Sequence, residues 1–166
     1  MTNFVPSNTI DDVIDAVSAY LNIFQTVETV RGNVSRVPMP NDPFIQLTEV
    51  LTMALNKPIE TYYNDQTVNI SEHTRIDIQV DFFGWEISDL AKMVHGAFRT
   101  VWSVQQFPAW LSPLYCSYPQ KVVIQNAEDQ FEQRWIMTMS FQYNPDFYAP
   151  APSFTAVLPS ILNPVM

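Results

Sequence analysis

The residues of this chain that could do chemistry are two histidines, a single cysteine and several neighbouring carboxylates. His73 and His95 are too far apart for a His-x-x-x-His pair, and one cysteine cannot make a Cys-x-x-Cys pair, so the spacing favours no zinc site. Cys116 could act as a nucleophile if the fold placed a histidine beside it. Its neighbours are apolar and typical of a strand, where a lone cysteine usually behaves as a small hydrophobic residue. We therefore expect no metal, no cofactor and no catalytic cysteine.

The carboxylates offer one further route to catalysis. Asp77 and Asp81 lie on the same face of an alternating segment and could form an acid–base pair if that face lined a cleft. Arg75 shares this face, and Arg134 lies on a second alternating segment, so we expect the carboxylates to be solvated or to form ion pairs with these arginines. A small hydrolase that uses Cys116 or the two carboxylates stays an alternative, but we expect that the protein is not an enzyme.

Composition excludes several classes of protein. The chain has 166 residues and a formal net charge of −9, which repels phosphate backbones, so we expect no sequence-specific binding of nucleic acid. Its 3 glycines are isolated, so no phosphate-binding loop of the P-loop or dinucleotide type is present. The single cysteine excludes an internal disulfide. No apolar run approaches the roughly 20 residues of a membrane helix, and the first residues lack the basic and apolar regions of a secretory signal.

Hydrophobic periodicity predicts the elements that position these residues. Apolar residues three and four apart predict two helices, and alternation of apolar with polar residues predicts the main strands. We expect the apolar stripe of the second helix to cover the apolar face of the sheet; it comprises Leu90, Met93, Val94, Ala97, Phe98, Val101 and Trp102. The predicted ranges are a helix over 9–24, a short strand over 26–30, a strand over 44–55, a loop or the arms of a hairpin over 56–72, a strand over 74–83, a helix from its cap Ser88 to Gln106, strand-like pieces over 113–116 and 122–125, a turn over 126–130, and a strand over 133–143.

The simplest packing of these elements is an α+β fold with a single antiparallel or mixed β-sheet and two helices packed on one face. Residues 1–145 are expected to form the single domain, and residues 146–166 a proline-rich, extended C-terminal tail. This extension carries apolar residues between its prolines, whereas a disordered tail seldom has so much apolar surface. We expect it to pack either on its own domain or on a neighbouring subunit.

The strand predicted over 133–143 has an unusual polar face. Of the residues on this face only Arg134 is charged, whereas a solvated face usually carries more lysine and glutamate. The chain has 15% charged and 13% aromatic residues overall. This composition fits a protein whose surface is partly covered by neighbouring subunits. The candidate subunit interface combines this face with aromatic residues of the extension: Arg134, Ile136, Thr138, Ser140, Gln142, Phe147, Tyr148 and Phe154.

Several short segments follow one another in a characteristic order: Arg36-Val37-Pro38 with Pro40 and Pro43-Phe44-Ile45, Gln79-Val80-Asp81-Phe82-Phe83-Gly84, Pro113-Leu114-Tyr115-Cys116, Phe131-Glu132-Gln133-Arg134-Trp135, and Gln142-Tyr143-Asn144-Pro145. Their order and spacing resemble the neck or tail-terminator proteins of tailed bacteriophages, which are small virion proteins at the head–tail junction. The resemblance covers roughly residues 9–147 and includes no catalytic signature.

The resemblance implies a structural protein of the virion that is assembled in the host cytoplasm. It implies an α+β protomer that forms a hexameric ring, ends polymerisation of the tail tube and joins the tail to head-completion or connector proteins. The expected partners are further copies of the chain, the tube, the sheath where one exists, and those connectors, while DNA passes through the ring without sequence-specific binding. No cofactor and no membrane contact are implied. The alternative function is another phage tail or baseplate connector, or an adaptor protein.

Overall fold

The computed structural model describes residues 6–33, 40–64, 67–84, 87–125 and 131–150. No helix in this part of the chain is long and apolar enough to cross a membrane. Its elements follow the order α1 (Ile10–Asn22), β1 (Glu28–Arg31), β2 (Phe44–Ala54), β3 (Ile59–Asn64), β4 (Thr67–Ser71), β5 (Thr74–Phe83), α2 (Ile87–Phe98), α3 (Val101–Val104), β6 (Leu111–Cys116), β7 (Gln120–Gln125), β8 (Phe131–Tyr143) and β9 (Asp146–Pro150).

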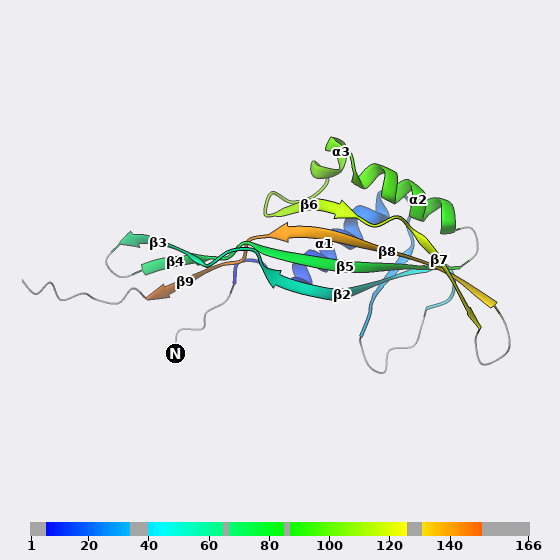
Figure 1. Ribbon diagram of the computed structural model, residues 1–166, viewed down its shortest axis with the longest axis horizontal. Coiled ribbons are helices and arrows are strands. Elements are labelled where there is room, and N and C mark those ends of the chain that lie inside the picture. The colour runs from blue at the N-terminus through cyan, green and yellow to red at the C-terminus, as the bar shows by residue number, and fades with distance from the viewer. Residues whose placement is uncertain (1–5, 34–39, 65–66, 85–86, 126–130, 151–166) are drawn as a thin grey trace, which may run out of the picture.

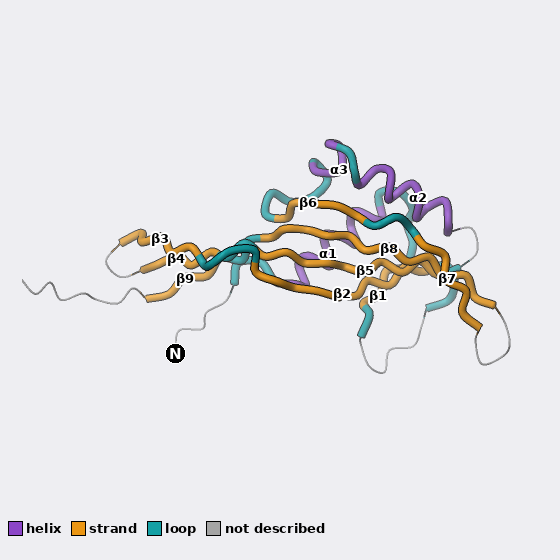
Figure 2. Tube along the Cα trace, viewed as in Figure 1, coloured by secondary structure: helices purple, strands orange, loops and turns teal. Residues whose placement is uncertain are grey.

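The strands form two sheets, so the predicted single sheet is wrong (Figure 1, Figure 2). The main sheet has the order β1-β2-β5-β8-β6, and β7 also pairs with β8. This sheet is mixed, because β1 runs parallel to β2 whereas the other pairs are antiparallel. The second sheet has the order β3-β4-β9 and projects from one end of the main sheet. We call this second sheet the arm.

The arm continues the two central strands of the main sheet. The β5–β8 ladder ends where Thr74 pairs with Tyr143, and the β4–β9 ladder begins where Ser71 pairs with Asp146. Pro145 lies between the two ladders and has no N–H group to donate. A proline at this position therefore interrupts the ladder and separates one pair of long antiparallel segments into two sheets.

The helices cover one face of the main sheet. Phe98 of α2 lies edge-to-face against Phe141 of β8, with 5.4 Å between the ring centroids. Buried residues of α1, α2, β2, β5 and β8 form one hydrophobic cluster, and α1 lies behind the sheet in the view of Figure 1. The predicted α+β class, mixed sheet and helices on one face are confirmed. The predicted alternation of β5 is confirmed as well, with these side chains fully buried: Ile76, Ile78, Val80 and Phe82.

The second helix is shorter than predicted. It was expected to run from a cap at Ser88 to Gln106, but Ser88 lies inside α2 and the helix ends before Thr100. The Thr100 hydroxyl donates a hydrogen bond to the Ala97 carbonyl at 2.7 Å and accepts one from the Ser103 N–H at 3.4 Å. Bonds of this kind compete with the helical ladder. Thr100 therefore ends α2 and caps α3.

This break turns the following residues away from the predicted stripe. Val101 and Trp102, predicted to face the sheet, are 78% and 42% exposed. Met93, another predicted member of the stripe, is also exposed. Ser103 is buried instead, and its hydroxyl donates to the hydroxyl of Tyr20 on α1 at 3.2 Å. The prediction of the buried stripe is therefore wrong at these positions.

The region after residue 145 also differs from the prediction. Residues 146–150, predicted to begin an extended tail, form β9 and pair with β4 of the same chain. A strand of five residues is too short for an alternation of apolar and polar residues to be recognised, and prolines flank this one. For residues 56–72 the hairpin alternative is confirmed, because β3 and β4 pair antiparallel. The predicted turn over 126–130 and the remaining part of the extension, with Phe154, lie outside the described residues.

Candidate functional site

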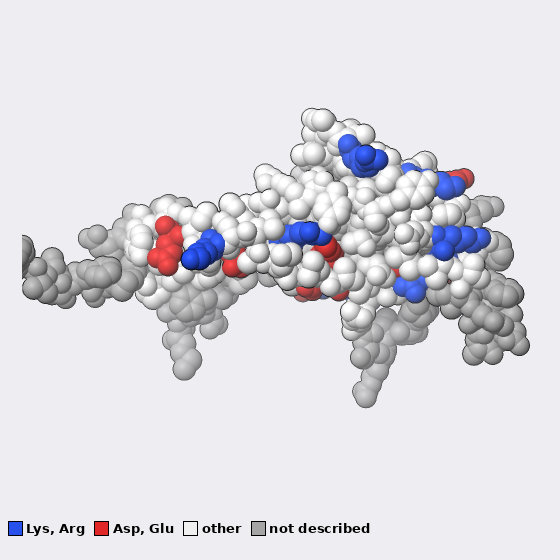
Figure 3. Space-filling view, in the orientation of Figure 1, with Lys and Arg blue, Asp and Glu red and all other residues white. Residues whose placement is uncertain are grey.

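The candidate site is the face of the main sheet turned away from the helices, which we call the outer face. Register places the five predicted residues of β8 on it, opposite the polar residues of β5. Figure 3 shows a surface that is largely uncharged, with few and scattered charged side chains. The charged residues of the outer face form two ion pairs, Arg75 with Asp77 and Arg134 with Asp81. The outer face includes Gln46, Thr48, Arg75, Asp77, Gln79, Asp81, Arg134, Ile136, Thr138, Ser140 and Gln142.

A buried ion pair lies at one end of the outer face. Arg134 donates to Asp81 from Nε at 3.2 Å and from Nη2 at 2.9 Å, and the Asp81 side chain has no exposed surface. The amide of Gln79 donates to both oxygens of this carboxylate, at 3.1 and 2.9 Å. The guanidinium carbon of Arg134 lies 5.2 Å from the centroid of the Phe83 ring. These contacts neutralise and hydrogen-bond a carboxylate that would otherwise be costly to bury.

A second ion pair lies nearer the arm. Arg75 donates to Asp77 from Nε at 2.8 Å and from Nη2 at 2.7 Å. Burial acts to raise the pKa of Asp77, but hydrogen bonds from Arg75 and Ser140 together with the charge of Arg75 outweigh it, so the pKa lies below its ordinary value. The predicted pairing of both aspartates with arginines is thus confirmed. Each carboxylate is engaged by its own arginine, so the arrangement provides no shared proton between them.

Four residues from neighbouring strands form one row across the outer face. Leu51 pairs with Asp77, Asp77 with Ser140, and Ser140 with Tyr115. Arg75 spans the middle of this row, because it bonds to Asp77 and also to the Tyr115 hydroxyl. Ser140 beneath it is fully buried. At the two ends, Leu51 is 41% and Tyr115 51% exposed, so apolar surface flanks a neutralised centre.

Two irregularities in the ladders produce this row. The β2–β5 register shifts between Glu49 and Leu51, and the β6–β8 register shifts between Pro113 and Tyr115. A bulge of this kind inserts one residue and turns the following side chains to the opposite face. Leu51 and Met53 would otherwise share the inner face with the start of β2. Sequence reasoning missed these apolar members of the outer face, because a bulge has no clear signal in a single sequence.

Two aromatic members of the predicted interface, Phe147 and Tyr148, lie on the arm. Phe147 and Tyr148 belong to β9 and pair in register with Ile70 and Asn69 of β4. The structure therefore does not place them beside the β8 residues of the same chain. The arm and the adjoining end of β2 also carry exposed apolar residues that the sequence analysis did not single out: Met53, Leu55, Ile59 and Tyr62.

The geometry around Cys116 does not make a nucleophile. Its Sγ donates to the backbone carbonyl of His95 at 3.8 Å, and the His95 ring lies edge-to-face on Tyr118. Burial raises the pKa of the Cys116 thiol against an opposing effect of Arg99. Burial also lowers the pKa of His95, and the charge of Arg99 lowers it further. A raised thiol pKa is the opposite of the lowered pKa that activates a catalytic cysteine, and the contact of the thiol is with the His95 backbone, not with its ring.

The structure offers no metal centre in the part of the chain that it describes. His73 lies at the base of the arm, where its Nδ1 is 3.4 Å from the side-chain nitrogen of Asn56. Among the described residues, no group of three or more His, Cys, Asp or Glu residues could hold a metal ion.

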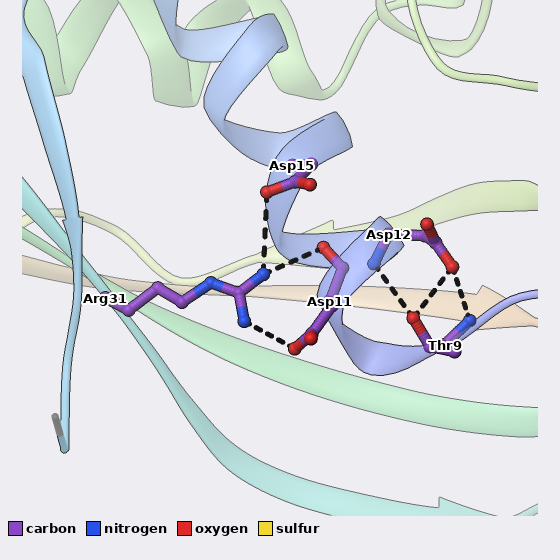
Figure 4. Close-up of polar contacts among 5 residues, drawn as sticks. All are labelled: Thr9, Asp11, Asp12, Asp15 and Arg31. Atoms are coloured by element: carbon purple, nitrogen blue, oxygen red, sulfur yellow. Dashed lines mark hydrogen bonds and ion pairs between the residues drawn. The ribbon is translucent and has the colours of Figure 1, made fainter.

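An apolar cavity of about 620 Å³, largely open to solvent, lies where the arm meets the main sheet. Its walls come from the start of α1, the end of β8 and the start of β9. Thr9 caps α1 in a reciprocal arrangement with Asp12, and Arg31 pairs with Asp11 and Asp15 beside it (Figure 4). These bonds fix the helix end that forms one wall of the cavity.

Comparison with known families gives one result. Residues 11–162 match the model of a family described as phage neck terminator protein. No curated protein sequence matches the chain. The match spans most of the chain, including both sheets and all the described helices except the first residue of α1.

Proposed function

The chain belongs to the phage neck terminator protein family, whose members are structural proteins of the virion, and we propose that it closes the end of a phage tail as a ring of identical subunits. The proposed ring has six subunits, stops polymerisation of the tail tube and joins the tail to head-completion proteins. Its further partners are the tube and, where one exists, the sheath. DNA passes through the ring without sequence-specific contact, which an acidic chain favours because it repels phosphates.

Apart from the family match, the row Leu51–Asp77–Ser140–Tyr115 on the outer face is the observation that supports contact between subunits. Its central charges are already neutralised within the protomer, by Arg75. Its ends are exposed and apolar. A face with neutralised charge and apolar margins suits contact with another protein, because little charge must be desolvated when the partner covers it.

A ring of identical subunits needs two different contact surfaces on each copy. The outer face supplies one surface in this proposal. The arm supplies the other, because it projects beyond the main sheet and carries exposed Ile59, Tyr62 and Tyr148 (Figure 1). The predicted interface residues Arg134, Ile136, Thr138, Ser140, Gln142, Phe147 and Tyr148 are then divided between the two surfaces.

The test is native mass spectrometry of the full chain over a range of concentrations, with and without purified tail tubes. A closed hexamer of 19.1 kDa subunits has a mass of about 115 kDa. We expect this species alone or on tube ends. Immunogold labelling of virions then separates the proposal from the connector or adaptor alternative: label at the neck supports it, and label only at the distal tail tip contradicts it.

A further inference from the structure

The cavity at the base of the arm has an apolar lining and firm walls. Its lining includes the apolar side chains of Pro6, Ile10, Pro145 and Phe147 and the ring of Tyr143. The segment before α1 is held to β9, because the Ser7 N–H donates to the Asp146 carbonyl at 2.7 Å. The return bond runs from the Asp146 N–H to the Ser7 hydroxyl at 3.1 Å. The cavity is thus preformed, which lowers the entropic cost of binding.

The electrostatics of the cavity favour an uncharged occupant. Asp11 is the charged residue in its lining, and Arg31 already pairs with this carboxylate (Figure 4). A cationic ligand would find the carboxylate engaged, and an anionic ligand would be repelled by Asp11 and by Asp15 nearby. An apolar ligand has no charge to desolvate in this cavity, and its transfer out of water is favourable in free energy.

The chain itself contains a segment with these properties. Residues 151–166 include no charged side chain. They are rich in apolar residues, namely Phe154, Val157, Leu158, Ile161, Leu162, Val165 and Met166. A segment of 16 residues can reach about 50 Å when extended. The segment follows β9 directly, so it starts from the arm.

The direction of β9 decides which copy's cavity the segment can enter. Asp146 pairs with Ser71 next to the cavity, whereas Pro150 pairs with Thr67 at the far end of the arm. To enter its own cavity the chain would have to reverse just after Pro150 and run back along β9. Prolines at 150 and 152 favour extended backbone at residues 149 and 151, so we expect the chain to leave the arm in the direction of β9, away from its own cavity.

We infer that the cavity binds the segment 151–166 of a neighbouring copy of the chain. The segment of each copy extends past the tip of its own arm and binds in the cavity of another copy. The cavity of each copy, between α1, β8 and β9, in turn binds the segment of a neighbour. The exchange is a head-to-tail contact, which closes when the rotation between copies closes. The inference rests on the proposed function only in requiring that copies of the chain meet.

Disulfide trapping in the full chain tests this inference. Cys116→Ala removes the native thiol, Asn8→Cys places a thiol in the cavity wall, and Thr155→Cys places one in the segment. A second pair uses Ser160→Cys in place of Thr155→Cys. The matched control joins Thr155→Cys to Val123→Cys, which is exposed on β7 and pairs with Gln133 at the other end of β8. A disulfide forms only when the two Cβ atoms come within about 4.5 Å.

After mild oxidation, non-reducing electrophoresis should show covalent multiples of the chain for at least one cavity pair, at least tenfold more than for the control. Cross-links closed within a single chain, or no excess over the control, would overturn the inference. Native mass spectrometry of the reduced protein tests the proposed function separately. A ring without cross-links contradicts only the exchanged segment, and cross-linked chains without a closed ring contradict only the ring.

Discussion

Asp81 is fully buried on a sheet face that no helix covers, and Arg134 on the neighbouring strand holds its carboxylate through bonds of 2.9 and 3.2 Å. Gln79 completes the set of donors around this carboxylate. The protomer therefore satisfies its own charge on the outer face before any partner arrives. A partner that covers this face does not have to supply a counter-ion, so the contact can be apolar and close-packed.

The first prediction concerns this pair. Arg134→Met removes the counter-ion and leaves a buried carboxylate, which should lower the free energy of unfolding by about 3 kcal/mol. Adding Asp81→Asn should recover much of the loss, because the buried charge is gone. Urea unfolding of the three proteins measures both effects. The control Arg99→Ala removes an exposed arginine and should change the free energy of unfolding by less than about 0.5 kcal/mol. Equal losses in the single and double variants would contradict the argument.

The second prediction concerns the pH dependence of stability through Asp77. Its pKa is lower in the folded than in the unfolded protein, so the carboxylate stabilises the fold above its ordinary pKa near 4. This contribution is lost as the pH falls through the folded-state pKa. Asp77→Asn should therefore destabilise by about 1–2 kcal/mol at pH 7, and the difference from the native protein should shrink in acid.

Unfolding free energies of both proteins from pH 7 down to pH 3 measure this difference. Asp89→Asn is the matched control, because Asp89 is exposed and its ion pair with Lys92 lies on the surface of α2. Surface pairs of this kind contribute little. A difference for Asp77→Asn that stays constant across the range would show that the charge of Asp77 is not what stabilises the fold.

The third prediction concerns the break between α2 and α3. Thr100→Ala removes the side chain that caps α3 and should destabilise the protein by about 1 kcal/mol. The change should also loosen the bond between Ser103 and Tyr20, because α3 positions Ser103. Thermal unfolding measures the loss, with Thr61→Ala on the exposed face of the arm as control. A variant as stable as the native protein would mean that packing of Ser103, not the cap, sets the break.

Periodicity in the sequence predicted much of the fold, because the signals are local. Helix α1 follows from its apolar stripe, and β5 and β8 follow from long alternation. The break at Thr100 could not be predicted in the same way. The apolar stripe continues through this position, whereas the Thr100 hydroxyl bonds to the backbone on both sides of the break.

The candidate site was predictable only in part, for a related reason. Alternation alone places every second residue from Arg134 to Gln142 on one face. The part of the outer face that β8 contributes therefore follows from the sequence. Leu51 and Tyr115 reach that face through bulges, whose positions depend on how distant strands pair. The second sheet could not be predicted for the same reason. Strand β9 forms by pairing with β4, which lies far from it in the sequence.

The fourth prediction concerns the outer face as a contact surface. Leu51→Lys should leave the protomer's fold intact, because Leu51 is exposed and its opposite residue, Asp77, is acidic. In an assembled ring the lysine would be buried in a contact without a free partner, so assembly should weaken roughly tenfold or more. Sedimentation or native mass spectrometry against concentration measures this. Met93→Lys, also at an exposed position but on α2, should assemble normally. Similar assembly of both variants would remove the outer face from the interface.

The last prediction separates the segment 151–166 from β9. Truncation after Pro150 leaves every described strand in place, so the melting temperature of the protomer should change little. Assembly should fall sharply if copies exchange the segment. Truncation after Tyr143 is a different experiment, because it also removes β9, the partner of β4. It should destabilise the arm as well as the assembly, since β3 and β4 alone would form an isolated hairpin, which is marginal in water.

The pair of truncations therefore gives a two-part readout. Hydrogen exchange of the β3–β4 amides should be unchanged in the chain ending at Pro150 and much faster in the chain ending at Tyr143. Loss of assembly in both chains, with arm protection lost only in the shorter one, assigns assembly to the segment itself. Normal assembly of the chain ending at Pro150 would show instead that β9 and the arm suffice, because the segment would then make no contact on which the assembly depends.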